Sequence, residues 1–206
     1  MQNSRHLKTL RMVQMAVLLA LMILFAFTPL GYLRTPLVEI TFMPLLVAMG
    51  AILFGPAGGA FFGLIFGITS FVQCFGIDAM GTLMFQWNPV GTVILLIGAR
   101  VLCGWLTGLI FRGLQKIDRT KIVSYYAASL STAVLNTVLY ISAMLIFFWK
   151  DERFIGMMED FGAPTETIWV FIVAVFMLNG VVEALVNCIV GGSAAKVINK
   201  VVNKTN

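Results

Sequence analysis

The sequence predicts an all-α membrane protein in which six helices cross the bilayer and both termini lie in the cytoplasm. Hydrophobic residues make up 60% of the 206 positions and charged residues only 11%, whereas a soluble domain has about 25% charged residues on average. Apolar stretches long enough to cross a hydrocarbon core, about 20 residues each, recur along the chain. Basic residues gather on one side of these stretches and most acidic residues on the other.

Six apolar stretches define the expected helices. They are Thr9–Thr28, Thr41–Phe54, Ala57–Phe75, Pro89–Phe111, Ile122–Trp149 and Thr167–Ala195. The second is short for a span, so it is expected to be tilted, partial or extended outward. The first follows a basic lead, as in a signal peptide, but no small-residue cleavage site follows it, so we expect it to be retained. The longest polar stretch, Lys150–Glu166, is too short for a separate core, so residues 1–206 are expected to form one integral-membrane domain.

Charged residues predict the orientation of these helices. Those on the first side are mostly basic: Arg5, Lys8, Arg11, Arg112, Lys116, Arg119, Lys121, Lys196, Lys200 and Lys204. Those on the opposite side are mostly acidic: Glu39, Asp78, Asp151, Glu152, Glu159, Asp160 and Glu166. The positive-inside rule then predicts cytoplasmic termini and a cytoplasmic connection between the fourth and fifth spans. This topology accounts for the net charge of +5, so no nucleic-acid partner is expected.

Small residues predict two close contacts and one turn. The third span contains Gly59-xxx-Gly63-xxx-Gly67, a smooth strip along one helix face that lets a neighbouring backbone approach closely. Gly55-Pro56 predicts a sharp turn between the second and third spans. Ala16 and Ala20 form a small-residue pair on the first span, which suits either a helix of the same chain or a separate partner.

Arg100 is the most informative single residue because it is a charge in the middle of an apolar span. A guanidinium at bilayer depth costs about 3 kcal/mol on insertion scales, so a partner must offset that cost. Arg100 lies about eleven residues, or roughly 16 Å, from the outer start of its span. Asn136 and Asn179 lie near the same depth on the fifth and sixth spans, and Glu183 lies one turn deeper. The sequence leaves open whether Arg100 pairs with a ligand carboxylate or phosphate, with Glu183, or with both.

Aromatic and amide residues are the expected walls of a ligand pocket: Phe71, Gln73, Trp87 and Tyr140. An interfacial aromatic belt explains Trp87 equally well. No catalytic residue, metal site or cofactor is expected. The single histidine, His6, lies in the basic lead, the three cysteines lack metal spacing, and there is no phosphate-binding glycine loop. A transporter of this kind must therefore use an ion gradient or a separate ATPase.

Four features of the chain together point to a known family. They are its length, its topology, the pair Ala16-xxx-Ala20 and the segment Leu53–Gly59 at the turn between the second and third spans. The chain resembles the S components, the substrate-binding subunits of energy-coupling factor (ECF) vitamin transporters. The resemblance implies a six-helix subunit of the bacterial cytoplasmic membrane. It also implies that Ala16 and Ala20 dock on an EcfT-type transmembrane subunit energised by two ATPases. The resemblance further implies that the subunit captures its vitamin outside the cell and closes its outer loops over it. The subunit would then topple within the complex to release the vitamin inward.

Within that family the chain is most similar to the pantothenate branch. The similarity lies in the segments Leu64–Phe71 and Ala99–Leu102 and in Asn136 and Asn179. The similarity implies that Arg100 holds the carboxylate of pantothenate, and that Asn136 and Asn179 hold its amide and hydroxyl groups. Other vitamins remain alternatives: pyridoxine, folate or a riboflavin precursor. So do a self-sufficient proton-coupled carrier that titrates Glu183 and a scaffold in which Arg100 and Glu183 form an internal staple.

Overall fold

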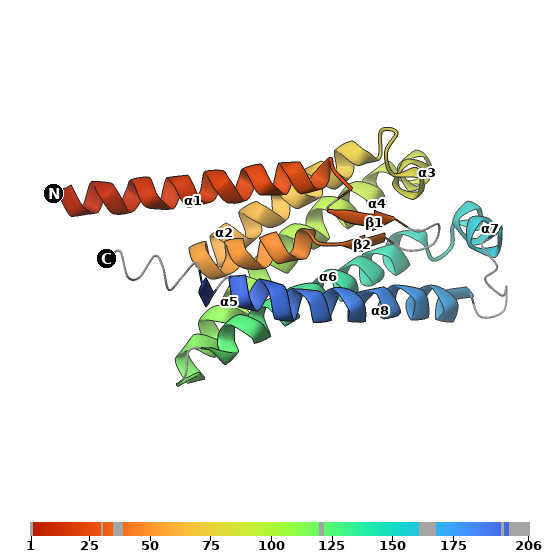
Figure 1. The fold of residues 1–206 in the computed structure, drawn as a ribbon. Coiled ribbons are helices and arrows are strands. Elements are labelled where there is room, and N and C mark those ends of the chain that lie inside the picture. Colours follow the sequence, from red (N-terminus) through yellow and green to blue (C-terminus); the bar gives the residue numbers. More distant parts are fainter. Residues whose placement is uncertain are drawn as a thin grey trace.

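The computed structural model is an elongated bundle of helices that run roughly along one direction (Figure 1). It describes residues 2–29, 31–34, 39–119, 122–160, 168–194 and 196–197. The long helices are α1 (Gln2–Ala26), α2 (Met43–Gln73), α5 (Ala99–Ile117), α6 (Val123–Phe148) and α8 (Ile168–Val186). The short elements are the strands β1 (Tyr32–Arg34) and β2 (Glu39–Thr41), the helices α3 (Ala79–Trp87), α4 (Pro89–Val93) and α7 (Glu152–Asp160), and the π-helical turns η1 (Ile94–Gly98) and η3 (Asn187–Gly191).

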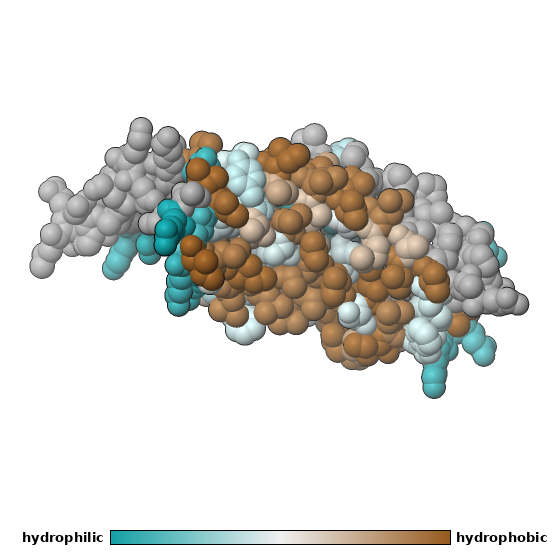
Figure 2. Space-filling view, turned by 90° about the horizontal axis from the view of Figure 1, so that it is seen from below, coloured by the Kyte–Doolittle hydropathy of each residue, from teal (hydrophilic) through white to brown (hydrophobic). Residues whose placement is uncertain are grey.

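A hydrophobic belt crosses the middle of one face of the molecule (Figure 2). Figure 2 shows apolar side chains over the central part of one face, with hydrophilic side chains toward both ends. Outward-facing Ile146 and Leu178 are 74% and 71% exposed, an arrangement that suits lipid and not water. The described helices long and apolar enough to cross a membrane are Lys8–Ala26, Met43–Gln73, Pro89–Ile117 and Val123–Phe148, and Gly180–Ala194 is a shorter apolar helix. The chain is therefore a multi-pass membrane protein. The four long helices overlap the first five predicted spans, whereas Gly180–Ala194 covers only the second half of the predicted sixth span.

The chain reverses direction inside α2, at Gly55. Gly55 has φ +75° and ψ −167°, a conformation that only glycine adopts readily, and Pro56 restarts the helix. Across this reversal the ring of Phe62 fills the space beside Gly50. A straight helix would hold those two residues roughly 18 Å apart. The predicted sharp turn at Gly55-Pro56 is confirmed, and the second and third predicted spans are the two arms of α2.

The second arm of α2 packs on α5 through direct backbone contact. A Cβ atom on Gly59 would overlap the carbonyl oxygen of Gly104, and one on Gly63 would overlap the carbonyl oxygen of Arg100. Gly67 approaches η1 in the same way, since a Cβ atom there would lie 2.7 Å from a backbone Cα. Glycine is the side chain that fits such contacts. The predicted role of the Gly59–Gly63–Gly67 strip as a close-packing face is confirmed.

Helix α1 is attached to the bundle along one face. Leu18, Met22 and Ala26 recur every four residues, and each is at most 4% exposed. Most other side chains of the described part of α1 are exposed or half-buried. At the end of α1, the carbonyl oxygen of Ala26 accepts a hydrogen bond of 2.6 Å from Nε2 of Gln73. This bond joins the last turn of α1 to the last turn of α2.

The predicted outer connections contain structure that the sequence did not indicate. Strands β1 and β2 form an antiparallel hairpin in which Tyr32 pairs with Thr41, so the expected all-α fold carries one short sheet. The next two connections contain α3 and α7, which lie at the same end of the bundle (Figure 1). Helix α7 buries Phe154 and Met158, which are one turn apart and pack against the bundle. Helices α3 and α7 therefore cap that end of the bundle (Figure 1).

Replacing Gly104 with alanine should destabilise the protein, because the added methyl group overlaps the Gly59 carbonyl oxygen. Overpacking of this kind costs about 1–3 kcal/mol. The midpoint of thermal unfolding in detergent measures the effect. Gly113→Ala on the same helix is the matched control, since nothing lies within 4 Å of its Cβ position. Equal midpoints for both variants would contradict the proposed backbone contact.

Candidate functional site

Arg100 lies in the first turn of α5, directly after the π-helical turn η1. Its guanidinium carbon lies 4.3 Å from the centre of the Phe66 ring and 5.8 Å from that of Tyr140. Its Nη1 donates a hydrogen bond of 3.0 Å to the carbonyl oxygen of Leu96. Two aromatic faces and one carbonyl therefore stabilise the cation within the bundle. Turns of the η1 kind are frequent at functional sites.

Within the described residues, no carboxylate forms an ion pair with Arg100; the ion pair present there joins Arg153 to Asp151 at 2.9 Å. Glu183, the acid that the sequence offered as a partner, accepts a hydrogen bond of 2.8 Å from the backbone N–H of Thr41. Glu183 is only 3% exposed. The internal staple between Arg100 and Glu183 is therefore not formed in this structure. Glu183 instead fixes the β1–β2 hairpin to α8.

One nitrogen of the Arg100 guanidinium lacks a hydrogen-bond partner among the described residues. Nη1 of the guanidinium is bound to Leu96, whereas Nε is buried and has no such partner. Buried donors are nearly always bonded, so an unpaired one calls for an explanation. Nε and Nη2 together present the two parallel N–H groups that grip a carboxylate. The site is chemically suited to an anion supplied from outside the chain.

The two predicted asparagines lie on neighbouring helices. Asn136 is half-buried on α6, one turn from Tyr140. Asn179 lies on α8, but its side chain is outside the described part of the structure. The next residue, Gly180, packs so closely on α6 that a Cβ atom there would lie 2.5 Å from Oγ1 of Thr137. Positions 136 and 179 are therefore at one level, and the convergence of their side chains with Arg100 stays a prediction.

Phe71, Trp87 and Tyr140 pack against one group of buried side chains, which we call the aromatic–methionine cluster. Its buried members are Cys74, Met84, Leu95, Leu96, Met144, Phe148, Phe154 and Met158. The cluster borders Arg100, because Leu96 accepts its hydrogen bond and Tyr140 faces its guanidinium. Three of the four predicted walls therefore lie in one apolar region next to the charge.

Gln73, the fourth predicted wall, forms a hydrogen bond between two helices. Its side chain is 2% exposed, and its amide nitrogen is bound to the carbonyl oxygen of Ala26. A buried amide is stabilised by such a bond, and breaking it would leave a polar group unsatisfied. Gln73 thus joins α1 to α2, and its role as a pocket wall stays a prediction.

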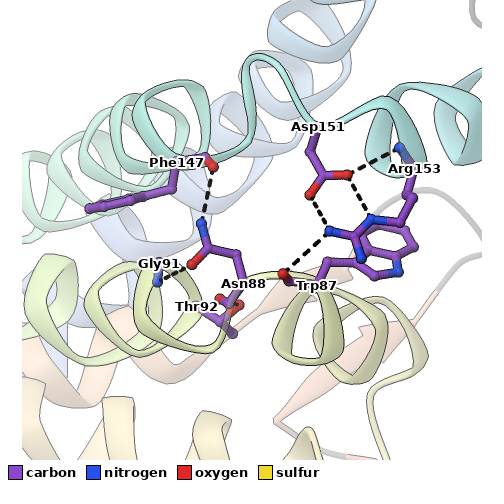
Figure 3. A network of polar contacts seen from close by, with 7 residues as sticks. All are labelled: Trp87, Asn88, Gly91, Thr92, Phe147, Asp151 and Arg153. Atoms are coloured by element: carbon purple, nitrogen blue, oxygen red, sulfur yellow. Dashed lines mark hydrogen bonds and ion pairs between the residues drawn. The ribbon is translucent and has the colours of Figure 1, made fainter.

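A polar network links the junction between α3 and α4 to the end of α6 and the start of α7 (Figure 3). Asn88 caps α4 and donates to the carbonyl oxygen of Phe147 at 3.3 Å. Arg153 binds Asp151 through two nitrogens and donates to the carbonyl oxygen of Trp87 at 3.3 Å. Its guanidinium also lies 5.8 Å from the Trp87 ring. Arg153 therefore connects the start of α7 to the end of α3.

Phe66 is the neighbour of Arg100 that sequence reasoning missed. A signal for it was present, because Phe66 lies beside Gly67 in the glycine strip and so near the surface that meets α5. The contact between Arg153 and Trp87 joins residues 66 positions apart and had no comparable signal.

Comparisons of the sequence with known proteins identify a family and a relative. The sequence model of the family described as "ECF transporter, substrate-specific component" matches residues 10–191. The chain is also 29% identical over 163 residues to the pantothenic acid transporter PanT of Lactococcus lactis subsp. cremoris (strain MG1363). That alignment covers 72% of this chain and 78% of the relative. The resemblance that the sequence suggested is confirmed.

Replacing Arg153 with glutamine should loosen α7, because the bonds to Asp151 and to the Trp87 carbonyl are lost. Hydrogen exchange of the α7 amides measures this and should become faster. Lys150→Gln removes a nearby exposed charge and is the control. Unchanged exchange in Arg153→Gln would show that the apolar contacts alone hold α7.

The stabilisation of α7 by the ion pair between Arg153 and Asp151 depends on pH in a definite direction. The hydrogen bond from Arg153 lowers the pKa of Asp151, so the stabilisation is present above the ordinary carboxyl pKa of about 3.9. It is lost as the pH falls through the lower pKa of the folded state. The protection that distinguishes the wild type from Arg153→Gln should therefore be the same at pH 5 and pH 8.

Proposed function

Because the chain belongs to the family of ECF transporter substrate-specific components, we propose that it captures a small carboxylate-bearing vitamin outside the cell, with pantothenate favoured. Membership of this family makes it a transporter component and not an enzyme. We further propose that it delivers the vitamin inward together with an EcfT-type membrane subunit and two ATPases. In this proposal residues 1–206 form one domain with six membrane-crossing segments and cytoplasmic termini.

The buried, unpaired Nε of Arg100 is the observation that carries the proposal. Pantothenate offers one carboxylate, which fits the Nε–Nη2 edge of a guanidinium already oriented by Phe66 and Leu96. Its amide and hydroxyl groups suit the side-chain amides of Asn136 and Asn179. The pantothenic acid transporter of Lactococcus lactis, to which the chain is similar, supports this choice of ligand.

The remaining predicted residues have supporting roles in this proposal. Phe71, Trp87 and Tyr140 supply the apolar walls, consistent with their packing on the aromatic–methionine cluster. Glu183 holds the β1–β2 hairpin through its bond to Thr41, and so shapes the site without touching Arg100. Most ligand pockets combine apolar walls with a few placed polar groups in this way.

The exposed face of α1 supports a docking role for Ala16 and Ala20. Both alanines are exposed and lie opposite the buried face of that helix. Val13 and Val17 beside them are each 54% exposed. A small-residue pair on a free apolar helix face allows another helix to approach closely, as docking on an EcfT-type subunit requires.

A proton-coupled carrier is the second candidate, because Glu183 is a buried acid within the predicted sixth span. It predicts that the chain alone, in proteoliposomes, takes up its ligand when a proton gradient is applied and that Glu183→Gln blocks uptake. The ECF proposal predicts no uptake without the ATPase module.

Arg100→Ala should weaken pantothenate binding by at least about 1.5–3 kcal/mol, the usual contribution of a hydrogen bond to a charged group. Arg100→Lys should weaken it less, because the charge is kept and only the bidentate geometry is lost. Titration calorimetry on the purified protein measures both. Pantothenol, which has a hydroxyl in place of the carboxylate, should bind the wild type and Arg100→Ala about equally.

Two controls make this result decisive. Arg119→Gln removes an exposed positive charge elsewhere and should leave affinity unchanged. Mass spectrometry of copurified small molecules checks that pantothenate is the ligand to use. Full pantothenate affinity in Arg100→Ala would assign the arginine a structural role.

Replacing Ala16 and Ala20 with tryptophan should abolish uptake by the complete transporter yet leave vitamin binding unchanged. The bulky rings would block approach of the partner helix, while both positions face away from the rest of this chain. Binding by the isolated chain and uptake by cells that contain the ATPase module are the two measurements. Val134→Trp, on an exposed position of α6, is the control. Equal loss of binding and uptake would contradict the docking role.

A further inference from the structure

A groove of about 550 Å³ opens at the end of the bundle where α1 begins, far from α3 and α7 (Figure 1). It lies between α1, the reversal in α2 and the last turns of α5. Its lining includes Arg11 and Met15 of α1, Phe54 and Gly55 of α2, and Phe111 and Arg112 of α5. The proposed vitamin site does not use this groove.

Two arginines from different helices line the groove. The side chains of Arg11 and Arg112 are exposed, and neither forms an ion pair with the described residues. The guanidinium of Arg112 lies over the α2 reversal, since a Cβ atom on Gly55 would be 2.7 Å from its Nη2. Two cations with no carboxylate partner attract an anion placed between them.

Nearby charges strengthen this preference for an anion. Lys8 and Lys116 lie one helical turn from Arg11 and Arg112 respectively, and both are exposed. The acid closest to them in the sequence is Asp118, whose Oδ2 accepts a hydrogen bond of 2.8 Å from the backbone N–H of Ser124. That carboxylate is therefore engaged at the α5–α6 turn.

The rest of the groove is apolar. Met15, Phe54 and Phe111 supply carbon surface beneath the two guanidinium groups. Met12, on the adjoining part of α1, is 69% exposed. A free phosphate ion would gain nothing from such walls, whereas a phospholipid combines an anionic headgroup with acyl chains.

We propose that this groove binds the headgroup phosphate of an anionic phospholipid, held by Arg11 and Arg112, with an acyl chain along Met15 and Phe54. Arginine suits this role because its planar group donates two parallel hydrogen bonds to phosphate. Basic pockets between transmembrane helices are a recurrent form of anionic-lipid site. The site does not depend on which vitamin occupies the region of Arg100.

The experiment adds phosphatidylglycerol or phosphatidylcholine with identical acyl chains to the purified chain in neutral detergent. The midpoint of thermal unfolding is followed as lipid is titrated. Phosphatidylglycerol should raise the midpoint of the wild type, and phosphatidylcholine should not. In Arg11→Gln/Arg112→Gln the apparent affinity for phosphatidylglycerol should fall roughly tenfold or more, since each basic group contributes to headgroup attraction.

Arg119→Gln is the matched control, because it removes an exposed charge that does not line the groove, and it should respond as the wild type does. The variant Arg11→Lys/Arg112→Lys keeps both charges and should retain part of the affinity. The proposal is overturned if phosphatidylcholine stabilises equally, if the double glutamine variant binds phosphatidylglycerol as the wild type does, or if soluble glycerol phosphate alone gives the full shift. An acidic helical peptide that displaces phosphatidylglycerol and binds more tightly would likewise assign the groove to a protein partner.

Discussion

The contact of backbone with backbone between α2 and α5 fixes the distances on which the candidate site depends. Gly63 lies against the carbonyl of Arg100, so the two helices are as close as their main chains allow. That spacing brings the Phe66 ring within 4.3 Å of the Arg100 guanidinium. Any side chain at position 63 would widen the gap and draw the ring away from the cation. The glycine strip thus determines both the stability of the bundle and the electrostatic setting of its internal charge.

Features governed by local rules could be predicted from the sequence. The reversal at Gly55 follows from a backbone conformation that glycine alone adopts readily, and Pro56 marks the helix that follows. The close face of α2 follows from glycines at four-residue spacing, a pattern that acts without knowledge of its partner. The apolar stretches gave the spans because a helix in lipid must satisfy its own backbone hydrogen bonds.

Features set by distant partners could not be predicted. Glu183 bonds to a backbone N–H 142 positions away, in a hairpin whose existence the sequence did not indicate. Several donors could have met that carboxylate, and only the packed structure selects Thr41 over Arg100. The bond from Gln73 to Ala26 could not be predicted for the same reason, because an amide near a helix end can face a pocket or a neighbouring carbonyl. Residue type identified the polar groups that matter, and packing decided which of them meet.

The bond between Gln73 and Ala26 has a consequence for how two events on this chain influence each other. It joins the end of α1 to the arm of α2 that carries Phe66 beneath Arg100. If a partner docks on α1 and a ligand binds at Arg100, as proposed above, the two events would be connected through this bond and the Phe66 contact. Free-energy linkage between two binding equilibria is reciprocal. To whatever extent a docked partner weakened ligand binding, the ligand would weaken docking by the same factor. The ligand-bound and the empty subunit would then differ in affinity for the partner.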